Sequence, residues 1–300
     1  MDRELDDLLR SGVFAWLDRE SDNGALPLSW SQLTRCRIAG EQVQLIGATG
    51  IWKPRQMELP VSITTAPPRG SRPAPYEDSF DADGLLTYRY RGTDPAHRDN
   101  TGLRRLGKER RGLVYFHGIR RGVYLATWPV FVVEDRPGDL AVKVMMADPR
   151  TFEPGLDPEV ADRAQARYTA RLTRQRLHQA DFRGRVLTAY RERCGFCHLR
   201  HTALLDAAHI REDSLGGAPA TSNGLALCKI HHAAFDHHII GLRPDLRVQV
   251  RPDVLEEVDG PMLRHGLQEL EGTPLLVPNR RADRPDASMV EERYERFLAR

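Results

Sequence analysis

Two stretches in the second half of the chain carry its clearest structural signal: CGFC at residues 194–197, and LLDAAHIREDSLGGAPATSNGLALCKIHHAAFD at residues 204–236. The first contains a C-x2-C spacing, and the second contains a C-x2-H spacing 30 residues further on. Each spacing brings two soft ligands close together, and two such pairs complete the tetrahedral shell that zinc prefers. The four expected ligands of a structural zinc are Cys194, Cys197, Cys228 and His231.

The alternative for these residues is a set of free core cysteines with an incidental histidine. Clustering of three of the four cysteines near histidines favours metal over disulfides in a cytoplasmic chain. The remaining cysteine, Cys36, stands alone and is expected to be a small buried hydrophobic residue.

The quoted region also holds the residue types that phosphodiester hydrolysis needs. A neutral imidazole titrates near physiological pH, so a histidine can take a proton from an attacking water. A divalent cation offsets the charge that develops on the phosphorane and on the departing oxygen. The order AAHI, GG, SNGLALCKIHHAAFD resembles the HNH, or ββα-metal, nuclease family over about 50 residues.

The resemblance assigns roles to three residues at matching positions. His209 corresponds to the first histidine of the family and is the expected general base on the first strand. Asn223 corresponds to the central asparagine, which pins the loop through backbone hydrogen bonds. His232 corresponds to the last histidine, at the start of the helix, and is expected to hold a catalytic Mg²⁺ or Mn²⁺.

The identity of the second protein ligand of the catalytic ion stays open, because the chain departs from the family at one position. Many members carry Asp or His directly before the first histidine, where this chain has Ala208. Asp206 lies three residues before His209, and Asp236 lies one helical turn after His232 on the same face. The i, i+4 spacing favours Asp236, and Asp206 is the alternative.

The first 150 residues are expected to be mainly β. Apolar residues at helical spacing predict a helix near residues 1–20, and short apolar runs broken by Gly and Pro follow. The stretch GLVYFHGIRRGVYLATWPVFVVED at residues 112–135 predicts two strands joined by a turn. After a change in composition, the Arg-rich segment 158–190 predicts a helix, and LRVQVRPDVLEE and residues 286–299 predict a last strand and a last helix.

PYEDSFDADGLLTYRY at residues 75–90 and the segments after it resemble SRA-like or PUA-like β-barrel modules. Such modules precede HNH domains in modification-dependent restriction enzymes, and they extrude a modified cytosine into an aromatic pocket. The residues that the resemblance offers for base binding are Tyr76, Asp78, Phe80, Tyr88 and Tyr90. The alternative is that Tyr88 and Tyr90 share one strand face and pack the core. A following loop offers Asn100, Arg104 and Arg105 to backbone phosphates.

The amino-acid composition favours a nucleic-acid partner only through its high arginine content. The net charge is +2 and the pI about 8.4, but all except four of the 44 cationic residues are arginine, which suits phosphate and guanine contacts. A GC-rich genome is the other explanation of this excess. No run of about eighteen uncharged apolar residues is present, and the acidic start MDRELDDLL does not resemble a secretory signal, so a cytoplasmic protein is expected.

The sequence therefore predicts an α+β chain with three parts. Residues 1–150 are expected to form an SRA-like DNA-recognition domain, 151–184 a basic helical linker, and 185–300 an HNH nuclease domain with a C-terminal helix. The expected function is a restriction endonuclease that cleaves double-stranded DNA containing 5-methylcytosine or 5-hydroxymethylcytosine, acting as a homodimer without membrane contact. The alternatives are an HNH enzyme that reads an unmodified sequence and a non-catalytic, zinc-stabilised DNA-binding protein.

Overall fold

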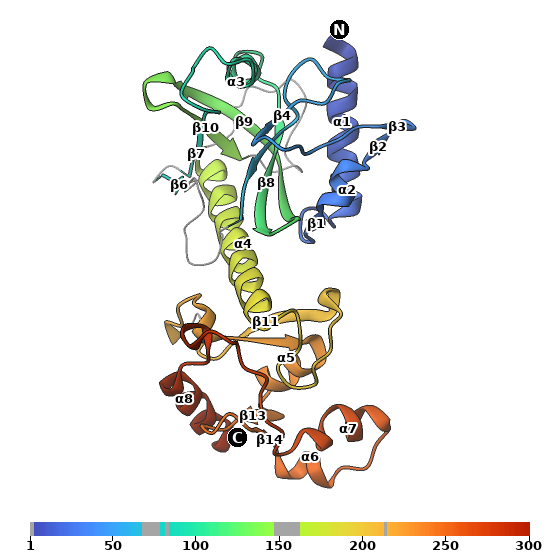
Figure 1. Ribbon diagram of the computed structural model, residues 1–300, viewed down its shortest axis with the longest axis vertical. Coiled ribbons are helices and arrows are strands. Elements are labelled where there is room, and N and C mark those ends of the chain that lie inside the picture. The colour runs from blue at the N-terminus through green and yellow to red at the C-terminus, as the bar shows by residue number, and fades with distance from the viewer. Residues whose placement is uncertain (1–2, 68–78, 82–83, 147–162, 213–214) are drawn as a thin grey trace. The chain divides into compact units, whose positions relative to one another are not determined.

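The computed structural model describes residues 3–67, 79–81, 84–146, 163–212 and 215–300 (Figure 1). The chain divides into two compact units, Met1–Leu177 and His178–Arg300. Among the described residues, no helix is both long enough and apolar enough to cross a membrane.

A mixed sheet forms the centre of the N-terminal unit. Its strands run in the order β4-β5-β8-β9-β10-β7-β6, with β1 paired to β9, and the described part of this path is open rather than closed. Neighbours are antiparallel except β5 and β8, which are parallel. The strands are β1 (Leu28–Ser29), β4 (Ile51–Trp52), β5 (Ser62–Thr65), β6 (Ser79–Phe80), β7 (Leu86–Arg89), β8 (Leu113–Arg120), β9 (Val123–Arg136) and β10 (Ala141–Met146). A small hairpin of β2 (Arg37–Ile38) and β3 (Glu41–Gln42) forms a separate two-stranded sheet.

The long hairpin of β8 and β9 confirms the two strands expected over residues 112–135. Gly122 at its turn has a φ of +73°, which glycine adopts without steric cost. Both strands are buried along most of their length, which explains their nearly continuous apolar sequence.

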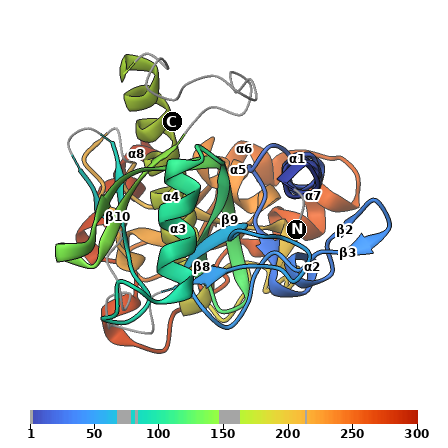
Figure 2. The same ribbon diagram turned by 90° about the horizontal axis from the view of Figure 1, so that it is seen from above.

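Two of the helices in this unit contact β9 of this sheet. The predicted N-terminal helix is confirmed as α1 (Arg3–Glu20), which buries Leu9, Val13 and Leu17, and α2 (Trp30–Thr34) follows β1. Helix α3 (Arg98–Lys108) packs on β9 (Figure 2).

The structure corrects the expected loop over this last segment, because it forms a helix. Leu103 and Leu106 are buried on one face of α3, and the His97 side chain accepts a hydrogen bond from Asp99 N as the N-cap. The glycines lower helix propensity but permit close packing. A Cβ at Gly102 would lie 2.8 Å from Pro60 Cδ, and one at Gly107 would lie 3.0 Å from the Val132 carbonyl oxygen.

The predicted helical connector is confirmed as α4 (Arg163–Ala189), whose course runs through the boundary between the units. Within the C-terminal unit, β11 (Leu205–His209) and β12 (Gly224–Cys228) form an antiparallel pair, followed by α5 (Lys229–Asp236). The remaining elements are β13 (Ile240–Leu242), β14 (Val248–Val250), α6 (Pro252–Glu256), α7 (Pro261–Gly266) and α8 (Ala287–Leu298).

The predicted last strand is shorter than its apolar pattern. It ends at Val250, and α6 begins with Pro252, which lacks an N–H and suits the first helical position. The last helix is confirmed as α8, capped by the Asp286 carboxylate. The chain is thus an α+β protein with a β–β–α segment in its C-terminal unit, and a closed SRA-like barrel stays a prediction.

Candidate active site and metal centre

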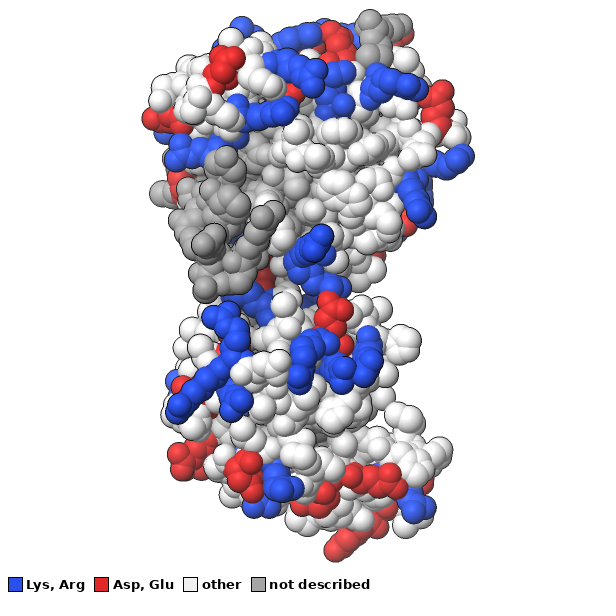
Figure 3. All heavy atoms as spheres, viewed as in Figure 1, with Lys and Arg blue, Asp and Glu red and all other residues white. Residues whose placement is uncertain are grey.

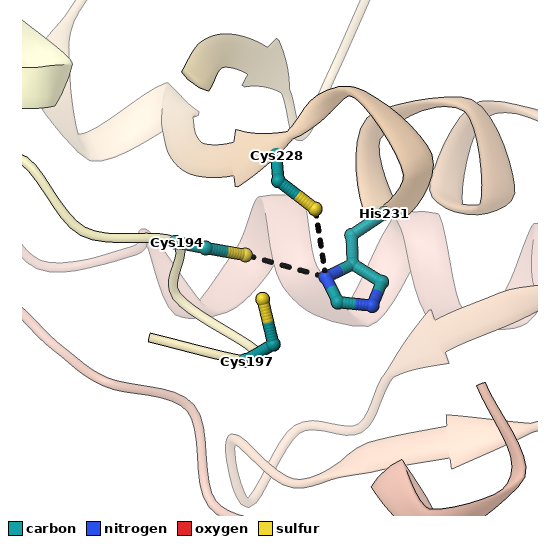
Figure 4. Close-up of side chains that lie close together, drawn as sticks. All are labelled: Cys194, Cys197, Cys228 and His231. Carbon is teal, nitrogen blue, oxygen red and sulfur yellow. Dashed lines mark hydrogen bonds between the residues drawn. The ribbon is translucent and has the colours of Figure 1, made fainter. Parts of the chain in front are cut away.

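Three cysteines and one histidine come together at the start of α5 (Figure 4). Their ligand atoms all lie within 4.8 Å of one another, and the Cys194 and Cys228 sulfurs are each 3.3 Å from His231 Nδ1. Three of the four residues are buried, and Cys197 is exposed. The four residues predicted from their spacing therefore form a group that could hold a metal ion.

The His231 ring is oriented by a contact outside this group. Its Nε2 lies 2.7 Å from the carbonyl oxygen of Gly266, the last residue of α7. When Nε2 carries the proton, it donates to this carbonyl and leaves Nδ1 as the ligand atom. Histidines that bind metals commonly donate their other ring N–H in this way. The sequence spacing gave no sign of Gly266, because it lies 35 residues further along the chain.

Close packing of the sulfurs shifts their protonation. Hydrogen bonding with Cys194 raises the pKa of Cys197 and lowers the pKa of Cys228. Burial alone would lower the pKa of His231, but hydrogen bonds to Cys194 and Cys228 raise it to about 10. Thiolate character at Cys228 is the form in which a cysteine binds a metal.

The β11–β12 pair positions the residues expected to act on DNA. His209 ends β11 opposite Gly224, and Asp206 lies on the same strand opposite Leu227. Side chains alternate along a strand, so Asp206 shares a face with Ala208, where many family members carry Asp or His. A carboxylate is thus present two residues before position 208, on the same face of the strand.

The His209 ring stacks on Phe182 of α4. The two ring centroids are 4.1 Å apart and the planes differ by 12°. Phe182 is 2% exposed, so its position is fixed by the core of the C-terminal unit. Phe182 was not identified from the sequence, where it is one apolar residue in an Arg-rich helix.

Asn223 is fully buried and holds the loop between β11 and β12. Its Oδ1 accepts from Arg211 N at 2.8 Å, and its Nδ2 donates to the carbonyls of Arg211 and Ala218, both at 2.9 Å. Gly217 leaves room for this arrangement, because a Cβ there would lie 2.0 Å from the Arg211 carbonyl oxygen. Close backbone packing thus explains Gly217, and Gly216 before it has a φ of +77°, which glycine adopts without steric cost.

Both candidate carboxylates lie beside His232, on opposite sides of its ring. His232 Nδ1 is 3.6 Å from Asp206 Oδ2, and Nε2 is 3.3 Å from Asp236 Oδ2. Interaction with Asp206 raises the pKa of His232. Burial would raise the pKa of Asp206, but His232, the Ala207 N–H and Arg183 together lower it.

Arg183 of α4 is another residue that the sequence did not single out. Its Nε lies 3.3 Å from Asp206 Oδ1, and its Nη2 donates to the Leu205 carbonyl at 2.6 Å. Helix α4 therefore contacts this site through both Phe182 and Arg183. Figure 3 shows that Lys and Arg of the C-terminal unit gather on the side of α4, while Asp and Glu gather toward α6, α7 and α8.

Of the predicted base-binding residues of the N-terminal unit, some are buried and others lie outside the described residues. Tyr76 and Asp78 lie outside the described residues. Tyr88 is 6% exposed and its hydroxyl donates to the Gly50 carbonyl at 2.8 Å. Tyr90 is 3% exposed, its hydroxyl donates to an Asp135 carboxylate oxygen, and burial with this contact raises its pKa to about 12. Both rings pack as core residues do.

The residues expected to touch phosphates have local partners. Asn100 is fully buried and donates to the Arg91 and Asp94 carbonyls. Arg104 donates to the Pro95 carbonyl, and Arg105 pairs with Glu58 and Glu109. Asn100 therefore holds the turn before α3.

A cavity of about 590 Å³ lies between β4, the chain after it and the start of α3. Trp52 and Pro60 supply apolar surface, and Lys53, Arg91 and Arg98 supply positive charge. The Arg98 side chain is 87% exposed. This cavity was not predicted, because its residues are spread over three separate segments.

Part of the C-terminal unit matches a known protein family. Residues 194–243 match the family model described as HNH endonuclease, and the chain therefore carries an HNH endonuclease domain. No curated protein matches the chain.

Two solved structures are similar to the chain at 15% identity. One is the modification-dependent TagI restriction endonuclease, with a TM-score of 0.29 over 79% of this chain and 81% of that one. The other is the type IV phosphorothioation-dependent restriction endonuclease ScoMcrA, with a TM-score of 0.26 over 84% of this chain and 56% of that one.

Asn223→Ala is expected to loosen the loop between the strands. The substitution leaves buried backbone groups of Arg211 and Ala218 without their partner, at about 1–3 kcal/mol for each group. Chemical denaturation of the purified chain should show the loss of stability, and Asn279→Ala, at an exposed asparagine of the same unit, should show almost none. Equal stability of the two variants would contradict this account of the loop.

Proposed function

We propose that the protein is a modification-dependent restriction endonuclease that hydrolyses double-stranded DNA at its HNH domain. The observation that carries this proposal is the β–β–α segment that bears His209, Asn223 and His232, with two carboxylates beside His232. A non-catalytic DNA-binding role would leave this set of side chains without a purpose.

In this proposal His209 is the general base. It takes a proton from the attacking water, and its stacking on Phe182 limits the rotation of the ring. Asn223 holds the loop that follows His209, so the base and the phosphate keep a fixed spacing.

His232 with Asp236 is the proposed site of the catalytic Mg²⁺ or Mn²⁺, and Asp206 is the alternative acid. The 3.3 Å between His232 Nε2 and Asp236 Oδ2 fits neighbouring ligand atoms around such an ion, which are about 3 Å apart. Imidazole with carboxylate is also a suitable donor set. When bound, the cation supplies charge stabilisation to the phosphate and to the leaving oxygen.

Zinc is the proposed ion of the Cys194, Cys197, Cys228 and His231 group. Three sulfurs and one nitrogen within 4.8 Å of one another suit zinc better than a hard cation. Because all four positions are filled by protein, this ion has a structural role.

The N-terminal unit is the proposed reader of modified cytosine. A nuclease domain needs a second surface to select its substrate, and this unit offers a cavity with an aromatic side chain and exposed arginine. Trp52 joins Tyr76 and Asp78 as a candidate for contact with an extruded base. One HNH site cuts one strand, so cleavage of both strands favours a homodimer.

The purified protein is expected to contain about one zinc per chain, measured by elemental analysis. Cys197→Ser should lower the stability of the C-terminal unit strongly, because a closed metal site contributes its binding energy to folding. Cys36→Ser, at a buried cysteine of the N-terminal unit, is the control and should leave the zinc content unchanged. Well-folded protein without zinc would exclude this site.

His209→Ala is expected to abolish DNA cleavage and to leave DNA affinity unchanged. The base acts on water and contributes little to binding of the ground state. Cleavage of plasmid DNA in Mg²⁺ or Mn²⁺ and gel-shift binding give the two readouts. His265→Ala, at an exposed histidine paired with Glu269, is the control and should cut normally. Near-normal cleavage by His209→Ala would remove this residue from the mechanism.

The full-length His209→Ala protein is expected to bind duplexes containing 5-methylcytosine or 5-hydroxymethylcytosine more tightly than the same duplex unmodified. A stacked base contributes about 1–3 kcal/mol, so Tyr76→Ala in this background should lower the preference by roughly tenfold or more. Trp30→Ala, at a half-exposed aromatic of the same unit, is the control. Equal affinity for all three duplexes would favour an enzyme that reads an unmodified sequence.

A further inference from the structure

Arg293 of helix α8 is a buried charge that the family match does not include. It lies 50 residues beyond the matched segment 194–243, and only 2% of its surface is exposed. Removing a guanidinium from water is costly unless it is paired and hydrogen-bonded. Its partners therefore indicate what it does.

Each of these partners belongs to the nuclease site or to its supporting loop. Arg293 Nη2 donates to the Phe235 carbonyl at 2.9 Å and lies 3.9 Å from Asp236 Oδ1. The guanidinium carbon is 4.7 Å above the centre of the Phe235 ring. Arg293 Nη1 lies 2.8 Å from Glu212 Oε1, in the loop that follows β11.

The two oxygens of Asp236 consequently face different residues. Oδ1 is directed to Arg293, and Oδ2 lies 3.3 Å from His232 Nε2. Arg293 also donates to the Phe235 carbonyl, one residue before Asp236, which is the final residue of α5. The end of the helix is thus held by a hydrogen bond from Arg293, and the same guanidinium lies within ion-pair distance of the Asp236 carboxylate.

We propose that Arg293 is a positioning residue for the catalytic cation, which holds Asp236 so that Oδ2 and His232 Nε2 meet at one ion. The inference rests on the proposed function, because it requires a divalent cation at His232. Helix α8 then belongs to the nuclease as a supporting element, since Glu292 beside Arg293 also pairs with Arg211.

The test is Mn²⁺ binding to the full-length, zinc-containing protein, measured by calorimetry without DNA. Arg293→Met should raise the Kd for Mn²⁺ by about 10- to 100-fold, the usual effect of losing a contact behind a metal ligand. Arg296→Met is the matched control, because Arg296 is on the same helix and 3.8 Å from the same Glu212. It should change the Kd less than about twofold, within the range of a surface substitution.

A double-mutant cycle separates positioning from general damage. In an Asp236→Asn background, Arg293→Met should add no further loss of Mn²⁺ affinity, because its effect passes through Asp236. If Arg293→Met does not fold, Arg293→Gln retains a donor for the Phe235 carbonyl and replaces it in the cycle.

An unchanged Kd in folded Arg293→Met or Arg293→Gln would overturn the inference, and so would an equal loss in Arg296→Met or in the Asp236→Asn background. If the wild-type protein binds Mn²⁺ and cuts DNA while these variants bind normally, only the role of Arg293 fails. If the wild-type protein neither binds Mn²⁺ nor cuts DNA, the proposed function fails, and the role of Arg293 with it.

Discussion

The convergence of Cys194, Cys197, Cys228 and His231 is the constraint on which the nuclease site depends. Cys228 ends β12 and is also the N-cap of α5, so this group fixes the angle at which the helix leaves the strand. His231 and His232 are neighbours in the first turn of α5. A ligand group that orients His231 therefore also sets the direction of His232, and the two proposed metal ligands share one helical turn.

Local spacing predicted this part of the molecule well, because its ligands recur within three residues of each other. The helix α1, the β8–β9 hairpin and α8 were likewise predicted from periodicity and turn residues. Helix α3 was not, because Gly102 and Gly107 lower its propensity while long-range packing against Pro60 and Val132 stabilises it. Local sequence carries no information about such contacts.

The candidate site likewise combines residues that local sequence predicted with residues that only the folded structure brings close. His209, Asn223 and His232 were identified by order and spacing, whereas Phe182, Arg183 and Arg293 reach the site from helices that are distant in sequence. For the second carboxylate, i, i+4 spacing favoured Asp236, and the structure brings Asp206 to the other side of His232 as well. The alternation of side chains along β11 predicts which strand face carries Asp206. It does not predict that α5 brings His232 next to that face, because this depends on tertiary packing.

The C-terminal unit begins at His178, well before the 194–243 segment that matches the family model, and it includes α8. Phe182 on one side and Val290 of α8 on the other belong to the same hydrophobic core. A nuclease module transplanted onto a foreign DNA-binding protein would therefore need residues 178–300. A fusion cut at the family boundaries would carry the recognisable signature without the scaffold that makes it rigid.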